Sequence, residues 1–286
     1  MMAAEQEVVV LTRDENNKAT VNLHGGTLQS WVHNGTEMIF VSKNAVFDNK
    51  KGIRGGIPVV FPQFGPWELG PQHGFARTSR WQCTSPPSTN SGGDVSATFT
   101  LTDTDATRAI WNHKFKLDLV VVVKAGSLDT SLTATNNNDA ESFSFTCLLH
   151  TYFSLPDVTK STVSGLGGLT YIDKTAGGEK KQETEDPKTV SKYVDYIYLE
   201  AVKDHVITNA AGGKTICLKK TNLPDTVGWN PWSEKAKAMS DFGDDQYPTL
   251  VCEAAMSAAS RPLSWKELPL LSELSPSSDR PALVLL

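Results

Sequence analysis

The chain has 286 residues, and its 27 Lys and Arg against 32 Asp and Glu give a net charge of −5 at pH 7. This length suits one large β domain or two smaller domains, and it can bury a sizeable core without disulfides or metal ions. Because the chain is mildly acidic, it lacks the basic surface that nucleic acids and anionic membranes attract, so neither is an expected partner. A hydrophobic content of 39% and a charged content of 21% are ordinary for globular proteins and exclude wholesale disorder.

Four cysteines are spread along the chain with no CxxC pair and no zinc-ligand spacing. Cys147 and Cys252 lie inside apolar runs, which favours buried free thiols and a reducing compartment. The first residues, MMAAEQEVVV, lack the basic and apolar regions of a signal peptide, and no apolar run is long enough to span a membrane. We therefore expect a cytoplasmic protein that binds no membrane and no metal ion.

Short β-branched runs with a period of two dominate the chain. In FKLDL, which begins at Phe115, apolar and polar residues alternate strictly. Comparable runs occupy residues 8–12, 19–23, 27–33, 36–41, 95–101, 128–134, 143–149, 196–201, 215–219 and 249–252. Such alternation is typical of antiparallel strands with one solvated face, so the sequence predicts an all-β sandwich or barrel with few short helices.

Segment 53–66, IRGGIPVVFPQFGP, interrupts this pattern. Pro58, Pro62 and Pro66 each remove a backbone donor, which a central strand does not tolerate, so we expect an irregular, partly buried loop. Arg54 precedes two glycines, where a backbone can approach a ligand closely. On this segment alone, a packed proline-rich turn with a surface arginine is the simpler interpretation, because one arginine beside glycines is a weak anion signal.

The following segment, 71–81, places His73, Arg77 and Arg80 in one short stretch that also contains two aromatic residues. A guanidinium group suits phosphate, and a histidine can bind a sugar hydroxyl or titrate near neutral pH. A half-dry anion-binding cleft and a solvated basic turn are both compatible with this stretch.

Three further segments complete the expected fold. Residues 85–93 and 174–189 are polar and are expected to be loops, neither long enough to divide the chain. The best helical pattern is 233–242, SEKAKAMSDF, which begins with a Ser cap. We expect a single β-sandwich domain over residues 1–286.

Three titratable residues interrupt or end strand-like runs. His150 ends an apolar run, where a histidine is more often a core or rim residue than a catalyst. Asp195, in KYVDYIYLE, is a weak candidate that also fits a turn. Glu253 interrupts the apolar run TLVCEAAM and is the strongest local signal, since a buried carboxylate needs a partner or a function.

Five distinctive segments occur along the chain in this order: IRGGIPVVFPQFGP, QHGFAR, LLHTYF, NLPDTVGWNPW and VCEA. Together they resemble the glucose-6-phosphate 1-epimerase (hexose-6-phosphate mutarotase) family, a branch of the aldose 1-epimerase superfamily, over roughly residues 20–256. The resemblance implies a large antiparallel β-sandwich, the galactose mutarotase-like supersandwich, which agrees with the period-two pattern.

The resemblance also implies roles for eight residues. It makes His150 and Glu253 the catalytic pair, and it places Arg54 and Arg77 against the phosphate of the substrate. The further residues that it implies at the sugar or at the rim are Gln72, His73, Asp195 and Trp232. It implies no cofactor, no metal and no macromolecular partner, so we expect a monomer that binds a small hexose phosphate.

One imidazole and one carboxyl group are sufficient for anomer exchange. A base removes the proton of the anomeric hydroxyl, an acid protonates the ring oxygen, and rotation about C1–C2 precedes closure on the other carbonyl face. We expect burial to raise the pKa of Glu253 and a nearby negative charge to keep His150 protonated.

Two alternatives remain open. A non-catalytic sugar-phosphate-binding β-sandwich would need the arginines but no acid–base pair, whereas an aldose 1-epimerase for unphosphorylated sugars would not need the arginines.

The chain also departs from the family after Glu253, where the atypical tail 266–286 lacks the usual Pro-Gly turn.

Overall fold

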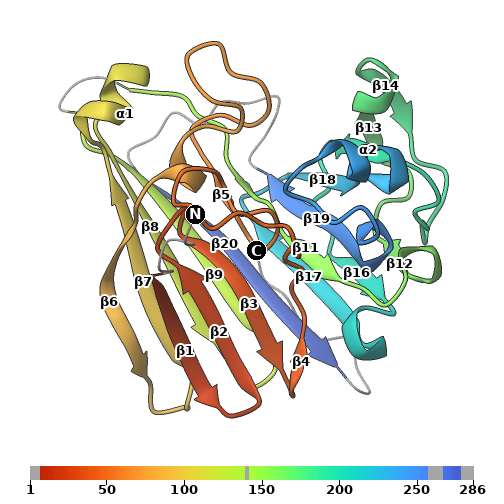
Figure 1. The fold of residues 1–286 in the computed structure, drawn as a ribbon, viewed down its shortest axis with the longest axis horizontal. Coiled ribbons are helices and arrows are strands. Elements are labelled where there is room, and N and C mark those ends of the chain that lie inside the picture. The colour runs from red at the N-terminus through yellow and green to blue at the C-terminus, as the bar shows by residue number, and fades with distance from the viewer. Residues whose placement is uncertain (1–6, 139–141, 257–266, 278–286) are drawn as a thin grey trace.

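The computed structural model describes residues 7–138, 142–256 and 267–277. Antiparallel strands dominate these residues, and the helices are few and short (Figure 1). The all-β expectation is thereby confirmed. Of the tail 266–286, residues 267–277 form a strand, and the others lie outside the described residues.

The long sheet contains eight strands in the order β12–β16–β17–β20–β9–β8–β7–β6. They are Thr162–Ser164 (β12), His205–Thr208 (β16), Thr215–Thr221 (β17), Glu267–Ser277 (β20), Leu128–Asn136 (β9), Phe115–Val123 (β8), Val95–Thr102 (β7) and Gln82–Thr89 (β6). All neighbouring pairs are antiparallel, and β20 lies between β17 and β9, so part of the atypical tail is built into the interior of this sheet.

A second sheet, called the pocket sheet below, has the order β14–β13–β15–β18–β19–β10–β5 with β11 also paired to β19. Its strands are Glu179–Gln182 (β14), Thr170–Asp173 (β13), Val194–Tyr198 (β15), Asp225–Asn230 (β18), Leu250–Met256 (β19), Leu148–Leu149 (β10), Val59–Val60 (β5) and Tyr152–Ser154 (β11). In Figure 1 its strands β13, β14, β18 and β19 lie at the right of the molecule, beside helix α2 (Trp232–Ala238).

Four N-terminal strands form a third, smaller sheet in the order β1–β2–β3–β4. They are Val8–Asp14 (β1), Asn17–Asn22 (β2), Thr27–His33 (β3) and Thr36–Glu37 (β4). The strands are red to orange in Figure 1, and β1 and β2 contact β6, β7 and β8, so this small sheet packs against that part of the long sheet.

The main core lies between the long sheet and the pocket sheet. Leu117 and Leu132 of the long sheet and Val251 and Ala255 of the pocket sheet belong to one buried cluster. Along β8, buried and half-buried residues alternate as the sequence predicts. Strand β19 is different, since every one of its residues is buried and it is covered on both faces.

Helices occupy little of the described chain. The α-helices are α1 (Asp105–Ile110) and α2, and the 3₁₀ segments are Ala76–Thr78 (η1), Val158–Lys160 (η2), Lys174–Ala176 (η3), Ala211–Gly213 (η4) and Tyr247–Thr249 (η5). A helix is confirmed there as α2, but Ser233 lies inside it rather than capping it, since Pro231 is the N-cap, and the helix ends at Ala238. No helix in the described ranges is both long and apolar enough to cross a membrane.

Two stretches expected to be loops contain strands. Strand β6 runs into 85–93 and includes Pro86 and Pro87, which is possible because β6 is exposed and pairs on one side only, with β7. Strand β14 lies inside 174–189 and forms the edge of the pocket sheet. Edge strands need no apolar face of their own, so their sequences resemble those of loops.

Candidate functional site

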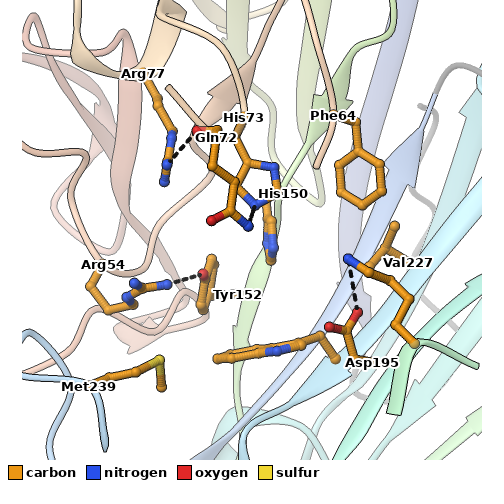
Figure 2. A pocket seen from close by; sticks show the side chains of 12 residues that line it. Arg54, Phe64, Gln72, His73, Arg77, His150, Tyr152, Asp195, Val227 and Met239 are labelled. Carbon is orange, nitrogen blue, oxygen red and sulfur yellow. Dashed lines mark hydrogen bonds and ion pairs between the residues drawn. The ribbon is translucent and has the colours of Figure 1, made fainter. Parts of the chain in front are cut away.

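A pocket of about 250 Å³ opens on the face of the pocket sheet that points away from the main core (Figure 2). Its lining residues are Arg54, Phe64, Gln72, His73, Arg77, His150, Tyr152, Lys174, Asp195, Val227, Trp229 and Met239. Six of the eight residues that the resemblance implies are therefore brought together here, although they come from loops and strands far apart in the sequence. The two that are not among the lining residues are Glu253 and Trp232.

Arg54 enters the pocket from the irregular segment before β5. The next residue, Gly55, has a φ of 119°, and a Cβ there would lie 2.5 Å from the carbonyl oxygen of Phe40, so glycine is required for this close approach. The Arg54 side chain donates from Nε to Asp241 at 3.2 Å and from Nη1 to Tyr152 Oη at 3.4 Å. Burial alone would lower the pKa of Arg54, but Tyr152 and Asp241 raise it overall, so the side chain stays charged.

Arg77 reaches the same pocket from η1. Its Nη2 donates to the carbonyl oxygen of Gln72 at 2.9 Å, and its Nε is buried without a hydrogen-bond partner in the described part of the chain. Burial is the main reason that the pKa of Arg77 is lowered, with the nearby charge of Arg54 acting in the same direction. Arg77 forms no ion pair with a carboxylate of the described residues, so its guanidinium keeps donors for a ligand.

His73 is held by its backbone and by one ring nitrogen. Its φ is 68°, and its Nδ1 accepts a hydrogen bond from the backbone amide of Gly65 at 3.1 Å. Because Nδ1 accepts, the proton of the neutral ring lies on Nε2. Burial, followed by the charges of Arg77, Lys174 and Arg54, lowers the pKa of His73 to about 3. Near neutral pH it is an uncharged hydrogen-bond donor.

His150 lies at the centre of the pocket lining (Figure 2). Its ring stacks on Tyr152 at a centroid distance of 4.7 Å and lies 6.5 Å from the ring of His73. Its Nδ1 is buried and has no hydrogen-bond partner among the residues described. Burial, then His73 and the two arginines, lowers the pKa of His150 well below its ordinary value. The expectation of a protonated His150 is therefore wrong for the unliganded pocket, because positive groups rather than a negative one surround the ring.

Asp195 is the carboxylate in the pocket lining. It lies on β15, 3.8 Å from Lys174 Nζ, and it accepts a hydrogen bond from Tyr193 Oη at 3.4 Å. Burial raises the pKa of Asp195 and outweighs the opposing effect of Lys174. An acid with a raised pKa and an imidazole with a lowered pKa thus line the same pocket.

Glu253 lies on the opposite face of the pocket sheet. Its cross-strand partner is Gly228, whereas the neighbouring pair, Cys252 and Trp229, shares the face with the pocket. The Glu253 carboxylate is 1% exposed and accepts a 2.6 Å hydrogen bond from Nδ1 of His205, which is fully buried. The structure therefore does not bring Glu253 together with His150, because the parity of one strand directs its side chain into the main core.

Trp232 is also outside the pocket. It begins α2 with a φ of 54°, and its ring packs on Tyr247 at 5.1 Å, while Trp229 of the same NLPDTVGWNPW segment lines the pocket instead. Lys174 is a further lining residue that the sequence arguments missed, since nothing distinguishes it from the other lysines of its polar stretch. Tyr152, two residues after His150 in LLHTYF, offers a hydroxyl beside that histidine, and it also lines the pocket.

The sequence of the chain is similar to those of a known family and of named proteins. The family model described as aldose 1-epimerase matches residues 7–263 of the chain. The chain belongs to the aldose 1-epimerase family. A protein of Cenchrus ciliaris named "Putative glucose-6-phosphate 1-epimerase" is 37% identical over 267 residues, which cover 91% of this chain and 80% of that protein. A protein of Escherichia coli K12 with the same name is 35% identical over 258 residues, covering 88% and 84%.

Solved structures agree with this family membership. The crystal structure of a "putative mutarotase" from Salmonella typhimurium superposes with a TM-score of 0.86 at 30% identity, covering 95% of this chain and 90% of that one. A galactose mutarotase related enzyme from Lactobacillus acidophilus has a TM-score of 0.72 at 17% identity, which shows the shared fold alone. The expected galactose mutarotase-like fold is confirmed.

Proposed function

We propose that this member of the aldose 1-epimerase family interconverts the α and β anomers of a hexose 6-phosphate, with D-glucose 6-phosphate as the substrate to test first. The observation that carries the proposal is the convergence of two guanidinium groups with two uncharged imidazoles on one pocket. Relatives named as glucose-6-phosphate 1-epimerases support the choice of a phosphorylated substrate.

Arg77 and Arg54 are the groups that bind the phosphate in this proposal. Arg77 offers donors that form no ion pair within the described residues, and Arg54 is fixed by Asp241, with Nη1 donating to the pocket residue Tyr152. Charge-assisted bonds from guanidinium to phosphate are strong and directional, and a plain aldose would not need two such groups.

The sugar hydroxyls are bound by groups between the arginines and Asp195. The Nε2–H of His73 can donate to a hydroxyl oxygen, and Gln72 and Asp195 can accept from hydroxyl protons.

His150 is the group that moves a proton to or from the anomeric centre. A neutral imidazole at this position contributes roughly 10²–10⁴-fold through general acid–base catalysis. The chemistry requires proton transfer only, and we propose no cofactor for it.

We also propose that the protein acts as a monomer in the cytoplasm. The four cysteines are free, and three of them are buried, which is compatible with a reducing compartment.

Anomer-exchange NMR tests the proposal. Purified protein should accelerate α/β exchange of glucose 6-phosphate, and EDTA should leave the rate unchanged. His150→Asn should lose at least about a hundredfold in kcat while still binding the sugar phosphate, because the amide removes the proton-transfer group. Binding of glucose 6-phosphate with exchange at the spontaneous rate would refute the enzyme and favour the sugar-phosphate-binding alternative.

A further inference from the structure

Arg54 is held along one edge of its guanidinium group by a single carboxylate. Its Nε donates to Asp241 Oδ2 at 3.2 Å, and its Nη2 lies 3.2 Å from the same oxygen. The two side chains are 25% and 21% exposed, so the pair is shielded from much of the solvent. A guanidinium group is planar, so contacts along one edge fix the direction of its other N–H groups. One of these, on Nη1, donates to Tyr152 of the pocket (Figure 2).

Asp241 contacts Arg54 from outside the pocket lining. Met239 of the same segment lines the pocket, but Asp241 does not. Arg77 differs from Arg54 in this respect, because its Nη2 donates to a backbone carbonyl oxygen and it forms no ion pair within the described residues. A ligand in the pocket therefore meets the arginine rather than the acid, and only one of the two arginines has a carboxylate behind it.

The segment that carries Asp241, residues 239–246, is attached to the same support as Arg54. The backbone amide of Gly243 donates to Ser42 Oγ at 3.1 Å, and the backbone amide of Ser42 donates to the carbonyl oxygen of Arg54 at 2.9 Å. Both partners of the ion pair are thus connected to one residue, so their separation does not depend on a long flexible loop.

Packing beside this support holds the segment further. Phe242 is fully buried, and its ring lies 5.7 Å from the ring of Phe40. The side chain of Asn44 donates to the carbonyl oxygen of Phe242 at 3.2 Å. A binding residue keeps its geometry when the groups behind it are themselves locked by packing and hydrogen bonds, and Asp241 follows from such a locked segment.

We propose that Asp241 is a positioning residue, which holds the Arg54 guanidinium in its phosphate-binding orientation before the substrate arrives. This inference rests on the proposed function, because it concerns how that pocket recognises the phosphate group. It assigns to the segment 239–246 a role in selecting phosphorylated over free sugars, although its acid does not touch the ligand.

Two effects of Asp241 on phosphate binding have opposite signs. A free arginine side chain has many rotamers, and ordering it weakens binding, so an arginine that is already held binds more tightly. A negative charge near the site repels phosphate and weakens binding. Asp241 lies behind Arg54 and is already paired with it, so we expect the ordering effect to be larger than the repulsion.

The test measures Kd by calorimetry, and KM and kcat by anomer-exchange NMR, for glucose 6-phosphate and glucose with the full chain. Asp241→Ala should raise Kd and KM for glucose 6-phosphate by about three- to tenfold, the usual effect of ordering one long side chain, with little change in kcat or in the use of glucose. Asp241→Asn keeps an oxygen acceptor but no charge, so its Kd should lie between those of Asp241→Ala and the unmodified protein. Asp245→Ala is the matched control, since this acid of the same segment pairs with exposed Lys43, and it should change neither sugar.

A double substitution separates positioning from general damage. In the Arg54→Ala protein, removal of Asp241 should cause no further rise in Kd, because Asp241 acts through Arg54. A further rise, or equal losses on glucose and glucose 6-phosphate, overturns the inference. Tighter binding of glucose 6-phosphate by Asp241→Ala also overturns it, since repulsion would then be the main effect of the acid.

Failure of the proposed function has a different signature. An unmodified protein that binds glucose 6-phosphate without accelerating exchange would refute the enzyme, and the Kd values would still decide the role of Asp241. An unmodified protein that does not bind glucose 6-phosphate overturns both proposals. Should Asp241→Ala not fold, Asp241→Asn is compared with Asp245→Ala, and equal Kd values in these two variants overturn the positioning role.

Discussion

Burial holds both histidines of the pocket in the uncharged form. The ordinary histidine pKa of 6.5 applies to the unfolded chain, whereas His73 has a folded pKa of about 3, and that of His150 is also lowered. The neighbouring arginines add to this effect, so the pocket combines fixed positive charge with neutral donors and acceptors. Such a combination suits a phosphorylated, uncharged sugar ring better than a free cation or an apolar ligand.

Stability should depend on pH through these histidines. Between pH 6.5 and about 3 the unfolded chain binds a proton at His73 that the folded chain does not, so this contribution is fully present above pH 6.5 and is lost as pH falls. The slope approaches about 1.4 kcal/mol per pH unit for one proton. Urea unfolding at pH 7, 6 and 5 should show a shallower pH dependence for His73→Gln than for the unmodified protein. Equal slopes would contradict the buried, neutral assignment.

At the scale of elements, strands with one solvated face were predictable and strands with special environments were not. The strict alternation that begins at Phe115 predicted a strand there, and β8 begins at that residue. Strand β19 is buried on both faces, so its sequence, LVCEAAM, contains no alternation that reveals which face Glu253 takes. The register with β18 decides this, and register depends on long-range pairing that a single sequence does not display.

The loop that carries His73 depends on glycine at one position. Gly74 has a φ of 69°, and a Cβ there would lie 2.1 Å from the carbonyl oxygen of Phe61, whereas Gly65, with a φ of 80°, has no atom within 4 Å of its Cβ position. Both substitutions to alanine place a side chain on left-handed backbone, which lowers the free energy of unfolding by roughly 1–2 kcal/mol.

Gly74→Ala should therefore destabilise the protein by about 1–3 kcal/mol more than Gly65→Ala, the usual cost of overpacking. Denaturant unfolding of the two variants measures this difference directly, since Gly65→Ala controls for the backbone conformation. Equal losses of stability would show that the loop moves to accept the extra carbon, and that Gly74 does not fix the position of His73.

For the whole molecule, the ordered sequence segments predicted the family, the β-sandwich and six residues that share the pocket. They did so because four of the five segments supply loops or strands whose side chains line the pocket, VCEA being the exception. Trp229 lines the pocket because of how its strand pairs, and Lys174 does so because of where η3 lies. The local sequence pattern predicts neither of these. The place of the tail strand β20 inside the long sheet was likewise beyond local pattern.

The most direct test of the account compares anomer exchange of glucose 6-phosphate and of glucose by the unmodified protein and by Arg77→Ala. We expect the unmodified protein to favour the phosphorylated sugar. Arg77→Ala should lose about ten- to a hundredfold in kcat/KM for glucose 6-phosphate, the equivalent of about 1.5–3 kcal/mol for a charged hydrogen bond, with little change for glucose. Equal losses on both sugars, or equal use of both by the unmodified protein, would contradict the claim that this pocket recognises a hexose phosphate.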